Sequence, residues 1–180
     1  NYAHLPEHFS SQRSIDRLNL PSPEEKLALQ ELIATTLTAA GYHHIGLDHY
    51  VLPGDDLAIA QREARLLRNF QGYSVQMAED LVGLGVSAIS HVGNFYLQNE
   101  TDLEEYYQQL RDKQSPLWRG IQLTPADHLR RHVIMQLICN LYLDFSDCEA
   151  RFDIDFRSEF AQELLKLSAM TSDGLLHIDE

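Results

Sequence analysis

Cysteine, positive charge and long apolar runs are all scarce in this 180-residue sequence. The two cysteines, Cys139 and Cys148, are too few for a disulfide framework or a zinc site, so we expect two buried thiols in a reducing, cytoplasmic setting. The 14 basic residues against 27 acidic ones give a net charge of −13, which argues against a nucleic-acid or anionic-membrane surface. No apolar run approaches the ~20 residues that span a bilayer.

Both ends of the sequence lack features of a complete protein. Residue 1 is Asn rather than Met, and the apolar stretch 174–180 is typical of one hairpin strand without its return strand. We therefore expect a fragment of a longer protein. Apolar surface that the missing part would bury should promote self-association, which light scattering would measure.

The segment 68–90 is poor in charge and rich in glycine. Gly83 and Gly85 alternate with apolar residues, and the small Ser87 and Ala88 follow. Glycine lets another molecule approach the backbone closely, so the segment is a candidate lining for a site, with a tightly packed strand or turn as the alternative. It lacks the third glycine of a dinucleotide-binding turn and the Gly-Lys-Ser/Thr of a phosphate loop.

Capping signals and apolar periodicity predict an α+β, mainly helical protein. Helices should begin after Ser22 and Thr124, where Glu25 and Asp127 stand in the third helical position. The expected elements are these helices, further helices over about 56–68, 102–111 and 156–170, short strands at 43–50 and 118–121, and the closing hairpin strand at 174–180. Helices followed by a hairpin suggest a winged-helix-like module at the C-terminal end.

Arginines cluster on the expected helix over 56–68. Arg62, Arg65 and Arg68 make it the most basic stretch of an acidic chain. One interpretation is a solvated face paired with Glu63. The other is a clamp for substrate carboxylates, because the guanidinium fork matches carboxylate geometry.

Six blocks of the sequence together carry a family resemblance. They are Asn-Tyr-Ala-His-Leu-Pro at 1–6, Gly-Leu-Asp-His-Tyr at 46–50, Gln-Arg-Glu at 61–63, Arg-Asn-Phe-Gln-Gly-Tyr at 68–73, Gly-Leu-Gly-Val-Ser-Ala-Ile-Ser at 83–90 and Leu-Trp-Arg-Gly at 117–120. With them the sequence resembles the C-terminal portion of the bacterial oxygen-independent coproporphyrinogen III oxidases, which are radical S-adenosylmethionine enzymes of haem synthesis. The blocks at 68–73 and 83–90 are the most specific.

The resemblance implies the activity of the parent enzyme. Members of that family oxidatively decarboxylate two propionates of coproporphyrinogen III to vinyl groups, giving protoporphyrinogen IX through a 5′-deoxyadenosyl radical. Their [4Fe-4S] cluster is held by a three-cysteine motif in an N-terminal α/β barrel, and neither that motif nor that barrel is present in this sequence. We therefore expect the cluster and most S-adenosylmethionine contacts on a barrel that is the chain's missing partner, and no activity or bound cofactor in this portion alone.

Three parts follow from the resemblance. Residues 1–50 would be the last strand and helix of the incomplete barrel. Residues 51–121 would cover the active site, and residues 122–180 would form the helical C-terminal domain.

The resemblance also assigns individual site residues. Ala3 and Ile89 match S-adenosylmethionine contacts and would act through backbone groups or shape. Gln71 lies in a block that faces the substrate. Arg62 and Arg68 as anchors for the substrate propionates are our own hypothesis, based on the local excess of arginine and a tetracarboxylate substrate.

Two other functions remain open at this stage. One is a haem-carrying relative of the same superfamily without oxidase activity, against which the block at 68–73 counts. The other is a winged-helix-like module that binds a protein or nucleic acid. Net charge disfavours nucleic acid, and the expected helix 156–170 has just Arg157 and Lys166 as cations. A porphyrin-binding titration beside an activity assay would separate the alternatives.

Overall fold

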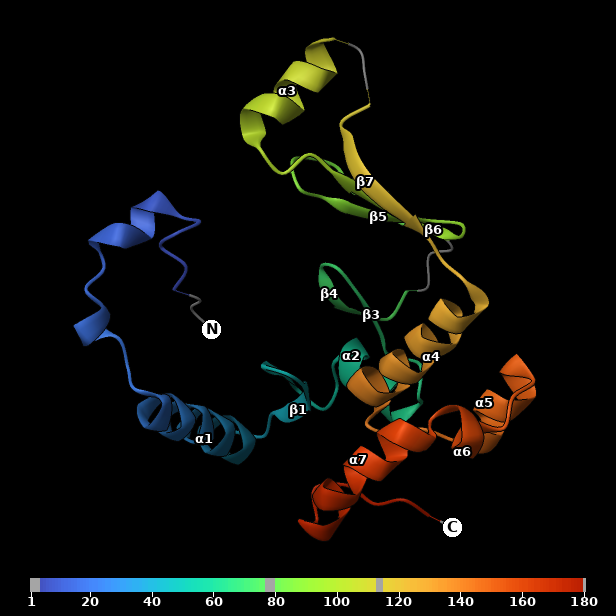
Figure 1. The fold of residues 1–180 in the computed structure, drawn as a ribbon. Helices are drawn as coiled ribbons and strands as arrows, with labels where there is room; N and C mark the ends of the chain where they lie inside the picture. The colour runs from blue at the N-terminus through green and yellow to red at the C-terminus, as the bar shows by residue number, and fades with distance from the viewer. Residues whose placement is uncertain (1–3, 77–79, 113–114, 180) are drawn as a thin grey trace.

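The N-terminal residues form an arm that stands apart from the body of the molecule (Figure 1). The computed structural model describes residues 4–76, 80–112 and 115–179. The arm contains two 3-10 turns, η1 (Ser10–Ser14) and η2 (Arg17–Asn19), and the helix α1 (Pro23–Ala39). The predicted capping box at the start of α1 is confirmed, because Ser22 Oγ accepts a hydrogen bond from Glu25 N at 3.1 Å and Glu25 Oε2 accepts one from Ser22 N at 2.8 Å.

The apolar face of α1 is exposed. Leu29, Leu32 and Ile33 have the spacing of a buried stripe, yet no residue of α1 is buried and Leu32 is 62% exposed. None of the described helices is long and apolar enough to cross a membrane. The face of α1 is therefore an apolar surface without a partner among the described residues.

Two small hairpins flank a short helix in the next part of the chain. The elements are β1 (His43–Gly46), β2 (His49–Val51), α2 (Asp56–Arg62), β3 (Leu67–Asn69) and β4 (Gly72–Ser74). The predicted helix over 56–68 is wrong beyond Arg62. Ala64 adopts a left-handed φ of 52°, and Arg65 N bonds back to Ala60 O at 2.7 Å, which closes the helix. Arg68 therefore lies on a strand.

A three-stranded antiparallel sheet follows, and the helix α3 lies beside it (Figure 1). Its strands are β5 (Ile89–Val92), β6 (Phe95–Asn99) and β7 (Leu117–Gln122), in the order β5-β6-β7, and α3 (Leu103–Arg111) connects β6 to β7. The predicted strand at 118–121 and helix at 102–111 are confirmed.

The glycine-spaced segment is a loop that leads into β5. Ser90 Oγ accepts from Gly83 N at 2.9 Å, and the buried Asn99 donates from Nδ2 to Gly85 O at 2.8 Å. Side chains of the sheet thus hold the loop in one shape just before Ile89.

The C-terminal part is helical. It contains α4 (Pro125–Asn140), α5 (Phe145–Phe152), α6 (Phe156–Glu159) and α7 (Ala161–Ser172), and Figure 1 shows α4 between the sheet and the later helices. The predicted start after Thr124 is confirmed, but the helix expected over 156–170 is broken at Phe160, whose ψ of 24° lies outside the helical range. The expected terminal strand is also wrong: described residues after Ser172 form no strand, and no neighbouring strand is there to pair with them.

A small core joins β1, α2 and α4. Its buried members are Ile45, Ala60, Leu66 and Cys139. Gln61 Nε2 donates to the carbonyl oxygens of Ile45 and Cys139, both at 2.7 Å, so one amide links three elements. Tyr73 donates its hydroxyl proton to Ile138 O at 2.9 Å and ties β4 to α4. These bonds fix the β3–β4 hairpin against α4.

Candidate functional site

A cavity of about 1160 Å³ lies between the sheet, the β3–β4 hairpin and the helices α4 and α5. Four of its lining residues are arginines: Arg68, Arg119, Arg131 and Arg151. Three are histidines: His91, His128 and His132. No Asp or Glu is among the lining residues in the described part of the chain, although the protein as a whole has a net charge of −13. The cavity lining is therefore rich in basic residues, although the protein as a whole is acidic.

The block at 68–73 forms the β3–β4 hairpin on one side of the cavity. Asn69 Oδ1 accepts from Gln71 N at 2.8 Å, and Gly72 has a φ of 137°, which favours glycine at the turn. The turn directs Arg68 and Phe70 to the cavity lining and leaves Gln71 exposed at its tip.

Arg68 is half-buried and incompletely paired. Its Cζ lies 4.6 Å from the ring centroid of Tyr73, and its Nη1 is buried without a hydrogen-bond partner among the described residues. Burial raises the pKa of Tyr73, and the Arg68 charge opposes that rise. A buried guanidinium nitrogen without an acceptor is costly, so it is a ready partner for an anionic ligand.

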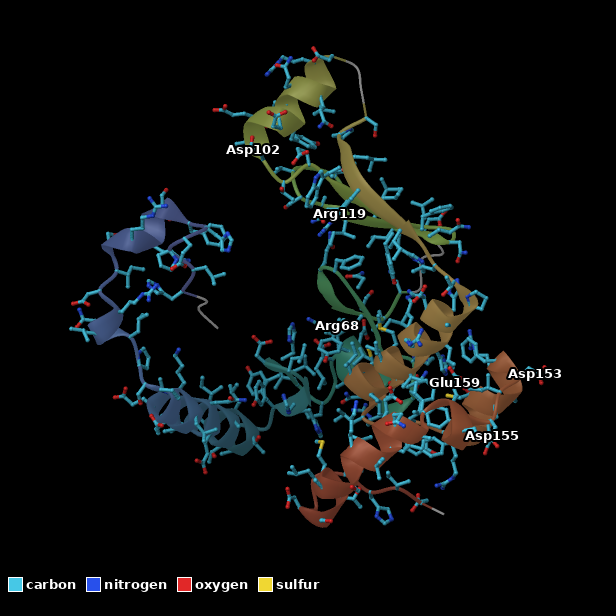
Figure 2. All side chains as sticks on the ribbon, viewed as in Figure 1. Arg68, Asp102, Arg119, Asp153, Asp155 and Glu159 are labelled. Carbon is cyan, nitrogen blue, oxygen red and sulfur yellow. The ribbon has the colours of Figure 1, made fainter. Side chains whose placement is uncertain are left out.

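The sheet supplies a second wall. Ile89, at the start of β5, and Arg119, on β7, both line the cavity, and Figure 2 shows Arg119 and Arg68 on different elements. Arg119 Nε donates to Gln98 Oε1 at 2.8 Å, which leaves its other nitrogens for a ligand. The ring of His91 packs against Tyr96 at 4.8 Å between centroids, and its Nε2 is buried without a described partner.

The helices α4 and α5 supply the third wall. His128, Arg131 and His132 are spaced i, i+3 and i+4 and so share one face of α4, and Arg151 comes from α5. His128 Nε2 hydrogen-bonds Asn94 Oδ1, which fixes the ring at the edge of the sheet. The helical face therefore places charged groups opposite the sheet wall.

Burial lowers the pKa values of His91 and His132. Arg131 lowers the His91 value further, with a smaller contribution of the same sign from His128, and Asp80 opposes both. Arg151 lowers the His132 value further, and Asp147, whose Oδ2 lies 3.4 Å from His132 Nε2, opposes it. The folded protein thus favours neutral imidazoles at neutral pH.

These pKa shifts predict acid-sensitive folding. Because the unfolded chain protonates His91 and His132 more readily than the folded one, the free energy of unfolding should fall as the pH drops below about 6.5. Urea unfolding at pH 7.5, 6.5 and 5.5 would measure the slope. The double substitution H91Q/H132Q should make the free energy of unfolding depend less on pH between 7.5 and 5.5. An unchanged pH dependence would contradict the assignment of this effect to the two histidines.

The structure brings together some of the predicted site residues. Ile89 and Arg68 line the same cavity. Arg62 does not line it: its Nη1 donates to Pro53 O at 3.0 Å on another surface. Gln71 does not line it either, and Ala3 lies outside the described residues.

Sequence reasoning missed most of the charged lining. The spacing of His128, Arg131 and His132 was a detectable pattern, and Arg119 belongs to one of the family blocks. No local sequence pattern marks Arg151 as a site residue, because it reaches the cavity through the packing of α5 beside α4.

The described residues do not fit an iron–sulfur cluster. No three or more His, Cys, Asp or Glu side chains among them are arranged to hold a metal ion. Cys139 and Cys148 are fully buried, and burial raises the pKa of both thiols, which disfavours the thiolate form that a cluster requires. No step of a reaction can be assigned to cluster ligands in this part of the chain.

Comparison with known proteins shows which proteins this chain resembles. Residues 123–180 match the family model of the HemN C-terminal domain. The whole chain is 51% identical to an oxygen-independent coproporphyrinogen III oxidase of Escherichia coli (strain K12) and spans 39% of that protein. A second oxidase, from Pseudomonas aeruginosa, is 49% identical over 99% of the chain. The resemblance to the oxygen-independent coproporphyrinogen III oxidases is confirmed.

A solved structure supports the same relationship. The chain superimposes on coproporphyrinogen III oxidase (HemN) from Escherichia coli, described as a radical SAM enzyme, with a TM-score of 0.93 and 52% identity. The match covers 100% of this chain and 42% of that one. The chain thus spans about two fifths of the length of the oxidases it matches. The match to the HemN C-terminal domain lies at residues 123–180 of this chain.

Proposed function

We propose that this chain is the C-terminal portion of an oxygen-independent coproporphyrinogen III oxidase and that its cavity receives the tetrapyrrole substrate. The observation that carries the proposal is the cavity itself, which has Arg68 and Ile89 in its lining and is cationic in an acidic protein. The substrate combines an apolar macrocycle with four carboxylates. A cavity with apolar and arginine side chains matches both features.

The size of the cavity supports this substrate class. Ligand pockets commonly measure about 300–1000 Å³ for drug-sized molecules. The volume here, about 1160 Å³, suits a larger ligand. Phe70 and Tyr96 meet edge to face at 5.4 Å between centroids, and Ile121 and Met135 add apolar surface for the macrocycle.

The proposed activity is the oxidative decarboxylation of two propionates of coproporphyrinogen III to vinyl groups. S-adenosylmethionine and a [4Fe-4S] cluster, held on the rest of the protein, would supply the radical that abstracts a propionate hydrogen. Residues of this chain would orient the substrate and exclude water around it. Ile89 and Ala3 would contact S-adenosylmethionine. The hydrogen bonds from the side chains of Ser90 and Asn99 to the loop before Ile89 would hold Ile89 in position for that contact.

Residues 1–50 fit the tail of a barrel. The exposed apolar face of α1 suits packing against the portion of the oxidases that this chain does not cover. Residues 51–121 would cover the active site, and residues 122–180 would form a C-terminal domain of winged-helix-like type. The two buried thiols suit a cytoplasmic enzyme.

A chimaera tests the proposal. This chain would replace the matching 39% of the Escherichia coli oxidase, to which it is 51% identical. Under anaerobic conditions the chimaera should convert coproporphyrinogen III to protoporphyrinogen IX, whereas the Escherichia coli protein without that portion should not. A folded chimaera that carries its cluster but releases no product would contradict the proposal.

A further inference from the structure

The positive charge of the cavity comes from two places. Arg68 comes from the hairpin and Arg119 from the sheet, and Ile89 lines the same cavity. Arg131 comes from α4 and Arg151 from α5; together with His132, whose lowered pKa favours the neutral ring, they are called here the helix wall. A ligand that filled the cavity would therefore meet cationic groups at both its hairpin side and its helix side.

The charges of the helix wall are not neutralised within the described residues. No ion pair of Arg131 or Arg151 occurs there, and the described acidic neighbour of His132, Asp147, is itself 63% exposed. Arg151 instead lies within 5.8 Å of the Phe152 ring centroid. Both guanidinium groups also act on the neighbouring imidazoles, since Arg131 lowers the pKa of His91 and Arg151 lowers that of His132. The wall is a region of positive potential that an anion would stabilise.

Apolar side chains accompany the cationic ones. Ile138 and Met135 of α4 and Phe152 of α5 line the same wall. This combination suits carboxylates carried on short alkyl chains at the edge of an apolar body rather than a small hydrophilic anion such as phosphate.

We propose that the helix wall binds the propionates that the reaction leaves intact. The inference rests on the proposed function, in which two of the four carboxylates are lost near Ile89. The helix wall lies on other elements, so it would hold the opposite edge of the macrocycle in the same way in substrate and product. Arg68 would then contact carboxylates that substrate alone carries.

Three stable porphyrins test this assignment in the 180-residue chain by fluorescence titration. Coproporphyrin III has four carboxylates, protoporphyrin IX retains two, and protoporphyrin IX dimethyl ester has none free. The double substitution R131Q/R151Q should weaken binding of both acids by about 100-fold, roughly tenfold for each charge-assisted pair. Binding of the ester should not change.

The ester separates a specific role from a structural one. Loss of the ester together with the acids would show that the two substitutions act through the fold and not through the carboxylates, which would overturn the assignment. The control R130Q changes an exposed neighbour of Arg131 on α4 that does not line the cavity, and it should bind all three porphyrins like the unmodified chain. Absence of binding by the unmodified chain, or an affinity of R131Q/R151Q for both acids equal to that of the unmodified chain, would overturn the inference.

The chimaera keeps the two proposals distinguishable. If it is active but R131Q/R151Q leaves its KM for coproporphyrinogen III unchanged, the helix wall is not a carboxylate site and the proposed function stands. If it is inactive while the porphyrins show the expected pattern, the carboxylate site stands and the proposed function fails.

Discussion

Substitution of Gly46 by alanine is expected to destabilise the protein by about 3 kcal/mol, through overpacking and backbone strain. Gly46 has a φ of 137°, and a Cβ at this position would collide with the Tyr73 hydroxyl and lie 3.2 Å from Ile138 O. The hydroxyl would have to leave its 2.9 Å hydrogen bond to that carbonyl. Urea unfolding monitored by circular dichroism would measure the loss.

Two variants make this prediction specific. Gly54 has no atom within 4 Å of an added Cβ, so G54A should change the free energy of unfolding by less than about 0.5 kcal/mol. Tyr73→Phe removes the atom with which the new Cβ collides, so G46A/Y73F should be more stable than the sum of the single effects predicts. Equal losses in G46A and G54A, or strict additivity with Y73F, would refute the packing argument.

Local hydrogen bonds explain why some elements could be predicted from the sequence. The helix starts after Ser22 and Thr124 depend on capping boxes formed within four residues, and both form as expected. The predicted helix over 56–68 was too long at its C-terminal end, because the position of that end depends on tertiary packing. Arginines at 62, 65 and 68 have helical spacing, but the fully buried Leu66 requires the chain to turn toward the core directly after α2.

The candidate site was predictable only in part for a similar reason. The family resemblance proposed Ile89 and the local excess of arginine proposed Arg68, and both residues line the cavity. Arg131 and Arg151 become site residues because α4 and α5 pack beside each other and β3 packs on α4. Such contacts between distant segments have no signature in a single sequence. Arg62 and Arg68 were expected on one helix, but Arg62 ends α2 and Arg68 lies on β3, so Arg68 lines the cavity and Arg62 does not.

Substitution of Arg68 by glutamine is expected to weaken binding of coproporphyrin III by about 10- to 100-fold, because a bidentate charge-assisted pair is lost. Binding of protoporphyrin IX should change little, since this ligand lacks the carboxylates that Arg68 would contact. The stability of the fold should stay within about 1 kcal/mol. The lost contact with the Tyr73 ring and the removal of an unpaired buried nitrogen have opposite effects.

Matched variants decide whether Arg68 has this role. R68K keeps the charge without the planar fork and should recover part of the affinity, because lysine binds carboxylates as a point charge. R62Q removes a neighbouring arginine whose Nη1 bonds Pro53 O outside the cavity, so it should bind both porphyrins like the unmodified chain. If R68Q kept its affinity for coproporphyrin III, or if R62Q lost as much, the cavity would not use Arg68 to hold the propionates. A stable R68Q chain that still binds protoporphyrin IX but has lost affinity for coproporphyrin III would assign Arg68 to substrate binding rather than to folding.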